Sequence, residues 1–233
     1  MARNVTTIGF DADDTLWHNE RFFQLTQSRF AALLADHGDP DQLGERLLAA
    51  ERRNLGHYGY GVKAFVLSMI ETAIEVTDGQ VPVRVISELI EAGREMLAHP
   101  IELLPHARAA VIAAADTHCV LLITKGDLLD QERKLAQSGL GDLFHGVEIV
   151  SDKTPVAYAA IFARHGHGAE RGLMLGNSMR ADVVAMIDAG GWGVFVPHGL
   201  NWEVEHAEPP LASPRYRRIA GLSGLSKLLA SIA

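Results

Sequence analysis

The feature that most restricts the fold is an alternation of short apolar runs with amphipathic segments in the part of the chain that follows Pro100. The alternation predicts helices at 106–115, 128–138, 155–165 and 180–189, and strands at 120–123, 147–150, 173–175 and 193–196. Helices of this length between strands indicate βαβ crossovers and a parallel sheet. This part of the chain therefore predicts a Rossmann-like α/β core.

One further strand, 5–10, precedes a block with a different period. From Glu20 to Leu97 apolar residues recur at spacings of three, four and seven, which is typical of roughly four amphipathic helices. The first strand has no partner until residue 120. We therefore expect an all-helical cap domain, 18–100, inserted into a core domain made of 1–17 and 101–233.

The composition excludes several classes of protein. With 21 basic and 29 acidic residues the net charge is −8, the wrong sign for neutralising nucleic-acid phosphates, so no nucleic-acid partner is expected. The N-terminus lacks the apolar segment of a signal peptide, and no run reaches the ~18 apolar residues of a membrane span. Cys119 is the only cysteine, which excludes an intrachain disulfide and suits a reducing compartment. We expect a cytoplasmic protein without a membrane partner, and nothing in the sequence predicts its oligomeric state.

Polar residues follow each predicted strand at its C-terminal end. They are Asp11 and Asp13, then Thr124-Lys125-Gly126, then Ser151-Asp152-Lys153, then Gly176-Asn177-Ser178 with Asp182 close behind. In open parallel sheets, ligands bind outside the carboxyl ends of the strands. We therefore expect these side chains to gather at one edge of the sheet.

These segments carry a resemblance to a known family. Phe10-Asp11-Ala12-Asp13-Asp14-Thr15-Leu16 resembles motif I (DxDxT) of the haloacid dehalogenase-like hydrolase superfamily. Thr124 resembles the motif II hydroxyl, Lys153 the motif III lysine, and 176–182 the acidic segment of motif IV. The inserted helical block resembles the C1-type cap of that superfamily.

The two motif I acids would carry the covalent chemistry. Asp11 follows the first strand directly, where the next backbone amides can form an anion-binding nest. The resemblance implies that Asp11 is the nucleophile, which attacks a phosphoryl group to form an aspartyl-phosphate; the alternative role is a helix N-cap. Asp13 would be the general acid and then the general base. It lies two residues after Asp11, so its side chain can point to the same side of the chain as that of Asp11. Asp14 is expected to be a cap or a surface residue.

Motifs II and III would bind the phosphate. Thr124, Lys125 and Gly126 lie between a strand and a helix, where free backbone N–H groups and the helix dipole favour an anion. Lys153 would hold a non-bridging phosphate oxygen and neutralise Asp11. The alternatives are a threonine that caps the next helix and a solvated loop lysine.

Several carboxylates facing a dianionic phosphate require a hard cation, and Mg²⁺ is the expected ion. The expected ligands are Asp11, the Asp13 backbone carbonyl, Asn177 and Asp182. Asn177 departs from the commonest pattern of the family, which has an acid at this position. We therefore expect either that Mg²⁺ binds more weakly or that Asp182 contributes more to Mg²⁺ binding. The alternative role of Asp182 is a first-turn acid favoured by the helix dipole.

Substrate choice is assigned to the cap. The segment 54–63 has closely spaced glycines beside His57, Tyr58 and Lys63 and is predicted to be a mobile, hydrogen-bonding loop. In it Lys63 would pair with a second anionic group of the substrate. The alternative is a solvent-exposed loop between helices.

Together these features predict a phosphoric monoester hydrolase, a Mg²⁺-dependent phosphatase of a small phosphorylated metabolite. One alternative is a 2-haloacid dehalogenase, which uses the same nucleophilic aspartate on carbon without a metal, and Asp13 counts against it. The other is a noncatalytic phosphometabolite-binding regulatory protein, which only Asn177 suggests.

Overall fold

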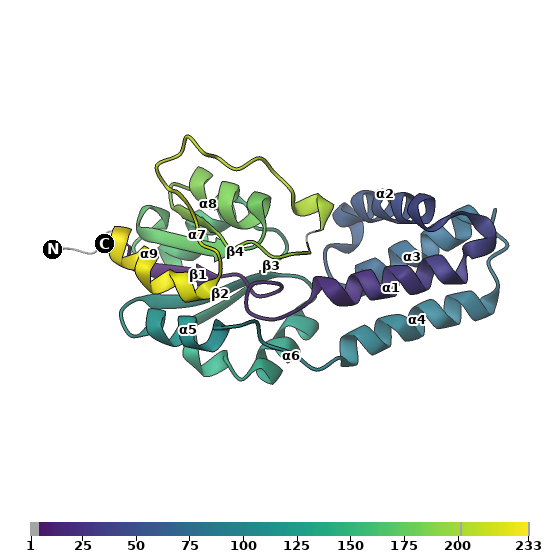
Figure 1. The fold of residues 1–233 in the computed structure, drawn as a ribbon, viewed down its shortest axis with the longest axis horizontal. Helices are drawn as coiled ribbons and strands as arrows, with labels where there is room; N and C mark the ends of the chain where they lie inside the picture. The colour runs from purple at the N-terminus through teal and green to yellow at the C-terminus, as the bar shows by residue number, and fades with distance from the viewer. Residues whose placement is uncertain (1–4, 201, 233) are drawn as a thin grey trace. The chain divides into compact units, whose positions relative to one another are not determined.

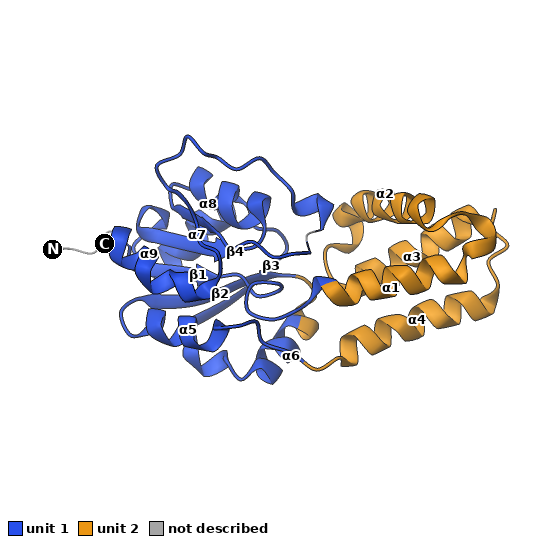
Figure 2. Cartoon of the chain, in the orientation of Figure 1, with its two compact units in different colours: residues 1–20, 101–125, 131–233 blue, residues 21–100, 126–130 orange. Residues whose placement is uncertain are grey.

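A computed structural model describes residues 5–200 and 202–232, and the chain divides into two compact units (Figures 1 and 2). Unit 1 comprises 1–20, 101–125 and 131–233, and unit 2 comprises 21–100 and 126–130. The predicted cap, 18–100, thus overlaps unit 2, but residues 18–20 group with unit 1 and residues 126–130 join unit 2.

Unit 1 is built on a parallel sheet with the strand order β3-β2-β1-β4-β5-β6. The strands are β1 (Thr7–Phe10), β2 (Cys119–Lys125), β3 (Gly146–Val150), β4 (Gly172–Gly176), β5 (Trp192–Phe195) and β6 (Tyr216–Arg218). The central strand β1 is buried along its length and pairs with β2 and β4. The predicted α/β class and parallel sheet are confirmed. The edge strand β6 was not predicted, because three residues with two arginines give no apolar run to detect.

Helices cover both faces of the sheet. They are α5 (Ala107–Ala115), α6 (Leu128–Ser138, whose first turn groups with unit 2), α7 (Pro155–His165), α8 (Ala185–Asp188) and α9 (Leu225–Ile232). One apolar cluster joins α5 and α9 to the sheet, and a second joins α7 and α8 to it. Thr154 caps α7 through Oγ1, which accepts from the Ala157 N–H at 3.1 Å, and Pro155 fits the first turn.

The segment predicted as a helix at 180–189 is a π-helix at Met179–Val184 that continues into α8. Ser178 caps it, since its Oγ accepts from the Ala181 N–H at 2.9 Å. A single π turn is a common device at functional sites because it changes which side chains face inward. Here it carries Asp182.

Unit 2 contains four long helices with a core of their own. They are α1 (Glu20–Leu33, which starts in unit 1), α2 (Pro40–Tyr58), α3 (Val62–Val76) and α4 (Val83–Ala98). The helical period predicted for 20–97 is confirmed, and its buried face includes Phe30, Leu47 and Met69. In the ranges that the structure describes, no helix has both the length and the apolarity needed to span a bilayer.

The expected loop at 54–63 is wrong except for residues 59–61, because residues up to Tyr58 form the last turns of α2 and α3 begins at Val62. Asn54 is buried and donates to Ser68 Oγ at 3.1 Å and to Glu71 Oε2 at 2.8 Å, which fixes this end of α2 against α3. Those contacts offset the intrinsic cost of about 1 kcal/mol for Gly56 within a helix. The helix ends instead at Gly59, whose φ of 71° suits glycine.

The chain leaves unit 1 and returns to it at adjacent points. The His18 N–H donates to the Glu102 carbonyl at 3.1 Å, and the Leu104 N–H donates to the Leu16 carbonyl at 2.8 Å. The outgoing and returning segments therefore lie side by side inside unit 1, held by backbone hydrogen bonds.

Candidate active site

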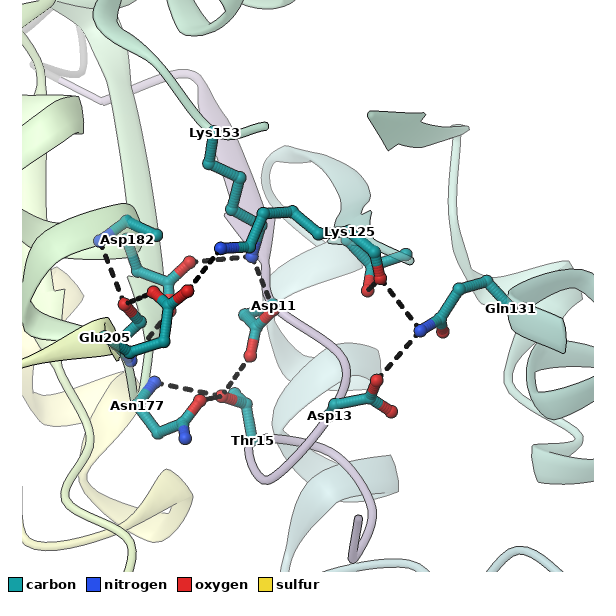
Figure 3. A network of polar contacts seen from close by, with 12 residues as sticks. Asp11, Asp13, Thr15, Lys125, Gln131, Lys153, Asn177, Asp182 and Glu205 are labelled. Atoms are coloured by element: carbon teal, nitrogen blue, oxygen red, sulfur yellow. Dashed lines mark hydrogen bonds and ion pairs between the residues drawn. The ribbon is translucent and has the colours of Figure 1, made fainter. Parts of the chain in front are cut away.

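Asp11 is the first residue after β1 and is 7% exposed. Its N–H donates to the Leu175 carbonyl at 2.9 Å, which continues the β1–β4 pairing. Its Oδ1 accepts from Lys153 Nζ at 2.5 Å, and its Oδ2 accepts from Thr15 Oγ1 at 2.9 Å (Figure 3). Both carboxylate oxygens are thus oriented by named donors.

Lys153 is shared between two buried carboxylates. Its Nζ lies 2.5 Å from Asp11 Oδ1 and 2.7 Å from Asp182 Oδ1, and Asp182 Oδ2 accepts from the Ser178 N–H at 2.9 Å. When both acids are ionised, the trio carries one negative charge in a place that excludes water. This arrangement places Asp182 beside Lys153 and Asp11, not at an isolated helix terminus.

Asp11 holds its proton more tightly than an ordinary aspartic acid does, in spite of its contact with Lys153. Burial raises the pKa of Asp11 to about 7, and repulsion from Asp182 adds to the rise, while Lys153 opposes it. Burial by itself would lower the pKa of Lys153, but attraction by Asp11 and Asp182 outweighs it and raises that pKa. Lys153 is therefore an ammonium at neutral pH, and the cluster has room for more positive charge.

Gly176 at the end of β4 makes the close approach of these acids possible. A Cβ at this position would lie 2.1 Å from Asp182 Oδ2 and 2.8 Å from Asp11 Cβ. Real side chains do not come that close, so any other residue would push Asp182 away from Lys153.

The oxygens around Asn177 fit a hard cation. One terminal atom of its amide group lies 3.1 Å from Asp11 Oδ2, 3.1 Å from the Asp13 carbonyl oxygen and 3.3 Å from Thr15 Oγ1. Neighbouring ligands of an octahedral Mg²⁺, each about 2.1 Å from the ion, lie about 3 Å apart. With the amide oxygen turned inward, Asn177 and the two aspartates would supply Mg²⁺ ligands. With the nitrogen turned inward, the amide N–H groups would donate to the same two oxygens.

The carboxylate of Asp13 faces a different set of partners. It accepts from Trp17 Nε1 at 2.7 Å, from Gln131 Nε2 at 2.8 Å and from Lys134 Nζ at 3.0 and 3.1 Å. Figure 3 shows it directed toward Gln131 on α6. Lys134 also donates to Asn19 Oδ1 at 2.8 Å. The residue assigned as general acid is therefore held by the helix that follows β2.

Motif II lies beside a carboxylate that the sequence did not predict. Thr124 is buried, and its Oγ1 lies 3.3 Å from the Lys125 carbonyl. Lys125 Nζ contacts Glu205 Oε1 at 2.5 Å, and the Glu205 carboxylate also accepts from Ser178 Oγ and lies near Arg180. Burial would raise the pKa of Glu205, but Lys125 and its other donors lower it overall. Lys125 thus pairs with the short 3₁₀ segment Glu203–Glu205.

The remaining predicted substrate contacts belong to unit 2. Gly126 has a φ of 125°, a backbone conformation that suits glycine. Tyr58 Oη donates to Glu71 Oε1 at 2.9 Å, Lys63 Nζ pairs with Asp127 Oδ2 at 2.9 Å, and the His57 ring lies near that of Tyr58. The structure brings together the motif I, III and IV residues, and a substrate role for these unit 2 residues stays a prediction.

Sequence reasoning missed several supporting residues. Thr15 was visible in the DxDxT pattern, and here its hydroxyl joins Asp11 to the Asn177 backbone N–H at 3.1 Å. Tyr158 is fully buried, and its Oη donates to the Ala181 carbonyl at 2.9 Å, which supports the π-helix that carries Asp182.

Comparisons with known proteins show what this chain is similar to. The family model described as haloacid dehalogenase-like hydrolase matches residues 5–190. A haloacid dehalogenase-like family hydrolase from Xanthomonas campestris is 41% identical and has a TM-score of 0.88; the match covers 99% of this chain and 93% of that one. The comparison with curated proteins found no match.

More distant structures share the fold. The HAD-hydrolase YfnB from Bacillus subtilis, solved bound to magnesium, is 18% identical with a TM-score of 0.66 over 97% of this chain and 99% of that one. A 2-haloacid dehalogenase from Pseudomonas syringae pv. Tomato DC3000 is 19% identical with a TM-score of 0.61 over 98% of this chain and 100% of that one. At these identities the likeness shows the fold alone.

Proposed function

Because the chain belongs to the haloacid dehalogenase-like hydrolases, we propose that it is a Mg²⁺-dependent phosphatase of a small phosphorylated metabolite, with Asp11 as nucleophile. The observation that carries the proposal is the surplus of buried negative charge at Asp11 and Asp182, which one lysine does not neutralise. A hard cation and a phosphoryl group together complete such a site, since the cation offsets the charge that would otherwise repel the phosphate.

In the first half of the reaction, a carboxylate oxygen of Asp11 attacks phosphorus and the bond to the leaving oxygen breaks. Asp13 gives its proton to that oxygen, so the product leaves as an alcohol. Lys153 stays on Asp11 Oδ1 and keeps the carboxylate oriented. Mg²⁺, when bound, supplies positive charge to the phosphoryl oxygens.

In the second half, Asp13 takes a proton from water, and the hydroxide attacks phosphorus. The bond between phosphorus and the Asp11 oxygen breaks, which releases phosphate and regenerates the carboxylate. Lys134 and Gln131 hold Asp13 through both halves by orienting its oxygens. They are positioning residues in this scheme.

A dehalogenase is the second candidate, and the Asn177 geometry is the observation that favours it. If the amide nitrogen faces Asp11 Oδ2 and the Asp13 carbonyl, it satisfies both oxygens without a metal. The same Asp11 would then attack carbon and displace a halide.

Two parallel assays separate the candidates. Hydrolysis of p-nitrophenyl phosphate is measured with Mg²⁺ and with excess chelator, and halide release from 2-chloropropionate is measured under the same conditions. The proposal expects phosphatase turnover that needs Mg²⁺ and is lost in Asp11→Asn. Halide release in chelator would establish the dehalogenase, and phosphate binding without turnover of any phosphate ester would favour a regulatory protein.

A further inference from the structure

A second group of side chains that could bind a metal lies apart from Asp11, Lys153 and Asp182. A carboxylate oxygen of Asp14 and one ring nitrogen each of His18 and His198 all lie within 4.8 Å of one another. Asp14 is buried, and the two imidazoles are half-buried. The residue types differ from those around Asn177, because two of the three donors are nitrogen.

The contact between Asp14 and His198 has the spacing of two ligands on one ion. Asp14 Oδ1 and His198 Nε2 are 3.6 Å apart, which is longer than a hydrogen bond of about 2.7–3.2 Å. Two ligands about 2.1 Å from a tetrahedral Zn²⁺ lie about 3.4 Å apart. The pair therefore needs only a small adjustment to hold a common ion.

Asp14 is held in place for this role. It adopts a left-handed backbone conformation with a φ of 59°, and its N–H donates to the Trp17 carbonyl at 2.7 Å. Its two carboxylate oxygens accept from the N–H groups of Asn19 at 2.9 Å and Glu20 at 2.8 Å. Hydrogen bonds of this kind orient metal-binding carboxylates and leave further lone pairs for an ion.

His18 is held through its backbone and His198 through its ring. The His18 N–H is bonded to the Glu102 carbonyl, and the His198 and His18 ring centroids are 6.0 Å apart. His198 Nδ1 lies 3.1 Å from the Leu200 carbonyl and 3.4 Å from the Leu200 N, and the shorter contact favours an Nδ1–H donor. In that tautomer Nε2, the atom that faces Asp14, is the nitrogen that binds a metal.

We propose that Asp14, His18 and His198 form a binding site for a borderline divalent transition metal, of which Zn²⁺ is the representative. Two imidazoles and a carboxylate match the nitrogen and oxygen ligands of such ions, while Mg²⁺ prefers oxygen ligands alone. Water completes the coordination. The ion would join the turn at 14–18 to the segment after β5, both in unit 1. It would therefore act on stability, and it does not depend on the reaction proposed above.

The competing explanation for the position of Asp14 is that it only caps the N–H groups of Asn19 and Glu20. A measurement of zinc binding separates this explanation from a metal site. Isothermal titration calorimetry of the untagged full chain with Zn²⁺, in excess Mg²⁺ to occupy oxygen sites, should show one equivalent bound. His18→Ala and His198→Ala should each raise the Kd for Zn²⁺ at least about tenfold, the scale on which even supporting residues of metal sites act. His167→Ala, at an exposed histidine of unit 1, should leave the Kd unchanged.

Asp14→Asn tests the carboxylate while keeping an oxygen that can cap, and circular dichroism establishes that each variant is folded. Co²⁺ provides a second readout, since its visible absorption reports nitrogen ligands, and this signal should fall in each histidine variant. The proposal is overturned if the wild type binds no Zn²⁺ in excess Mg²⁺. It is equally overturned if both histidine variants bind Zn²⁺ as tightly as the wild type does. Loss of Zn²⁺ binding in Asp182→Asn, together with unchanged binding in the two histidine variants, would also overturn it.

Discussion

Replacing Asp11 by Asn should make the cation-free protein more stable, although it removes the proposed nucleophile. The pKa of Asp11 rises from 3.8 to about 7 on folding, so the folded state binds this proton more tightly than the unfolded state does. The stability that this proton contributes is complete below pH 3.8 and is lost as the pH rises through about 7. Asn resembles the neutral acid and has no charge to bury.

The size of the effect follows from the same shift. At about 1.36 kcal/mol for each unit of pKa, the raised pKa of Asp11 costs the folded state about 2 kcal/mol at about pH 5 and about 4 kcal/mol at about pH 8, relative to the stability below pH 3.8. The free energy of unfolding of Asp11→Asn should exceed that of the wild type by these amounts. Added Mg²⁺ should narrow the gap at the higher pH, because a cation stabilises only the carboxylate.

Urea denaturation in EDTA, followed by tryptophan fluorescence, measures the difference. The three tryptophans, Trp17, Trp192 and Trp202, all belong to unit 1, so the signal reports the unit that contains Asp11. Asp142→Asn, at an exposed acid of the same unit, is the matched control and should show no pH-dependent gain. A gap that does not change with pH, or a variant less stable than the wild type at about pH 8, would refute the reasoning.

Three further outcomes are expected. Asn177→Asp should lower the Mg²⁺ concentration that gives half-maximal turnover, because it restores a charged ligand; a Mg²⁺ titration with unchanged midpoint would contradict this. Lys134→Met should lower kcat at least about tenfold, because it releases Asp13. General acid–base catalysis supplies about 10²–10⁴-fold, and misplacing Asp13 should lose part of it. An unaltered kcat in steady-state kinetics would show that Lys134 does not position Asp13. Gly176→Ala should cost about 1–3 kcal/mol of stability and abolish turnover, since its methyl group meets Asp182. Thermal denaturation and turnover both equal to the wild type would show that the strand end can shift.

The sheet edge could be predicted from the sequence because topology leaves little choice. Asp11, Lys153 and Asp182 follow strands that had to be parallel, and the carboxyl ends of such strands meet at one edge. The observed contacts of Lys153 with both acids agree with that expectation. The sequence did not reveal the charge balance at this site. That one lysine is shared by two carboxylates becomes evident only when the distances are known.

The partners of Asp13 depend on packing, which periodicity does not specify. Gln131 and Lys134 are three residues apart on α6 and therefore share a face, but the helix pattern does not say what that face meets. Glu205 lies in a tail segment with no helical or strand period, so no sequence signal placed it beside Lys125. Asn54 shows the opposite case, in which tertiary contacts kept residues beside a glycine helical.

The paired backbone hydrogen bonds of His18 and Leu104 have a consequence for how this protein can be altered. The outgoing and returning segments are joined within unit 1. The sheet therefore requires only that the two ends of the inserted residues 21–100 lie close together. Inserted domains are tolerated where their two ends lie close together. The helices α1 to α4 are therefore exchangeable for another insert whose ends meet, and if the substrate role predicted for unit 2 holds, such an exchange would change the substrate and leave the Asp11 site in place.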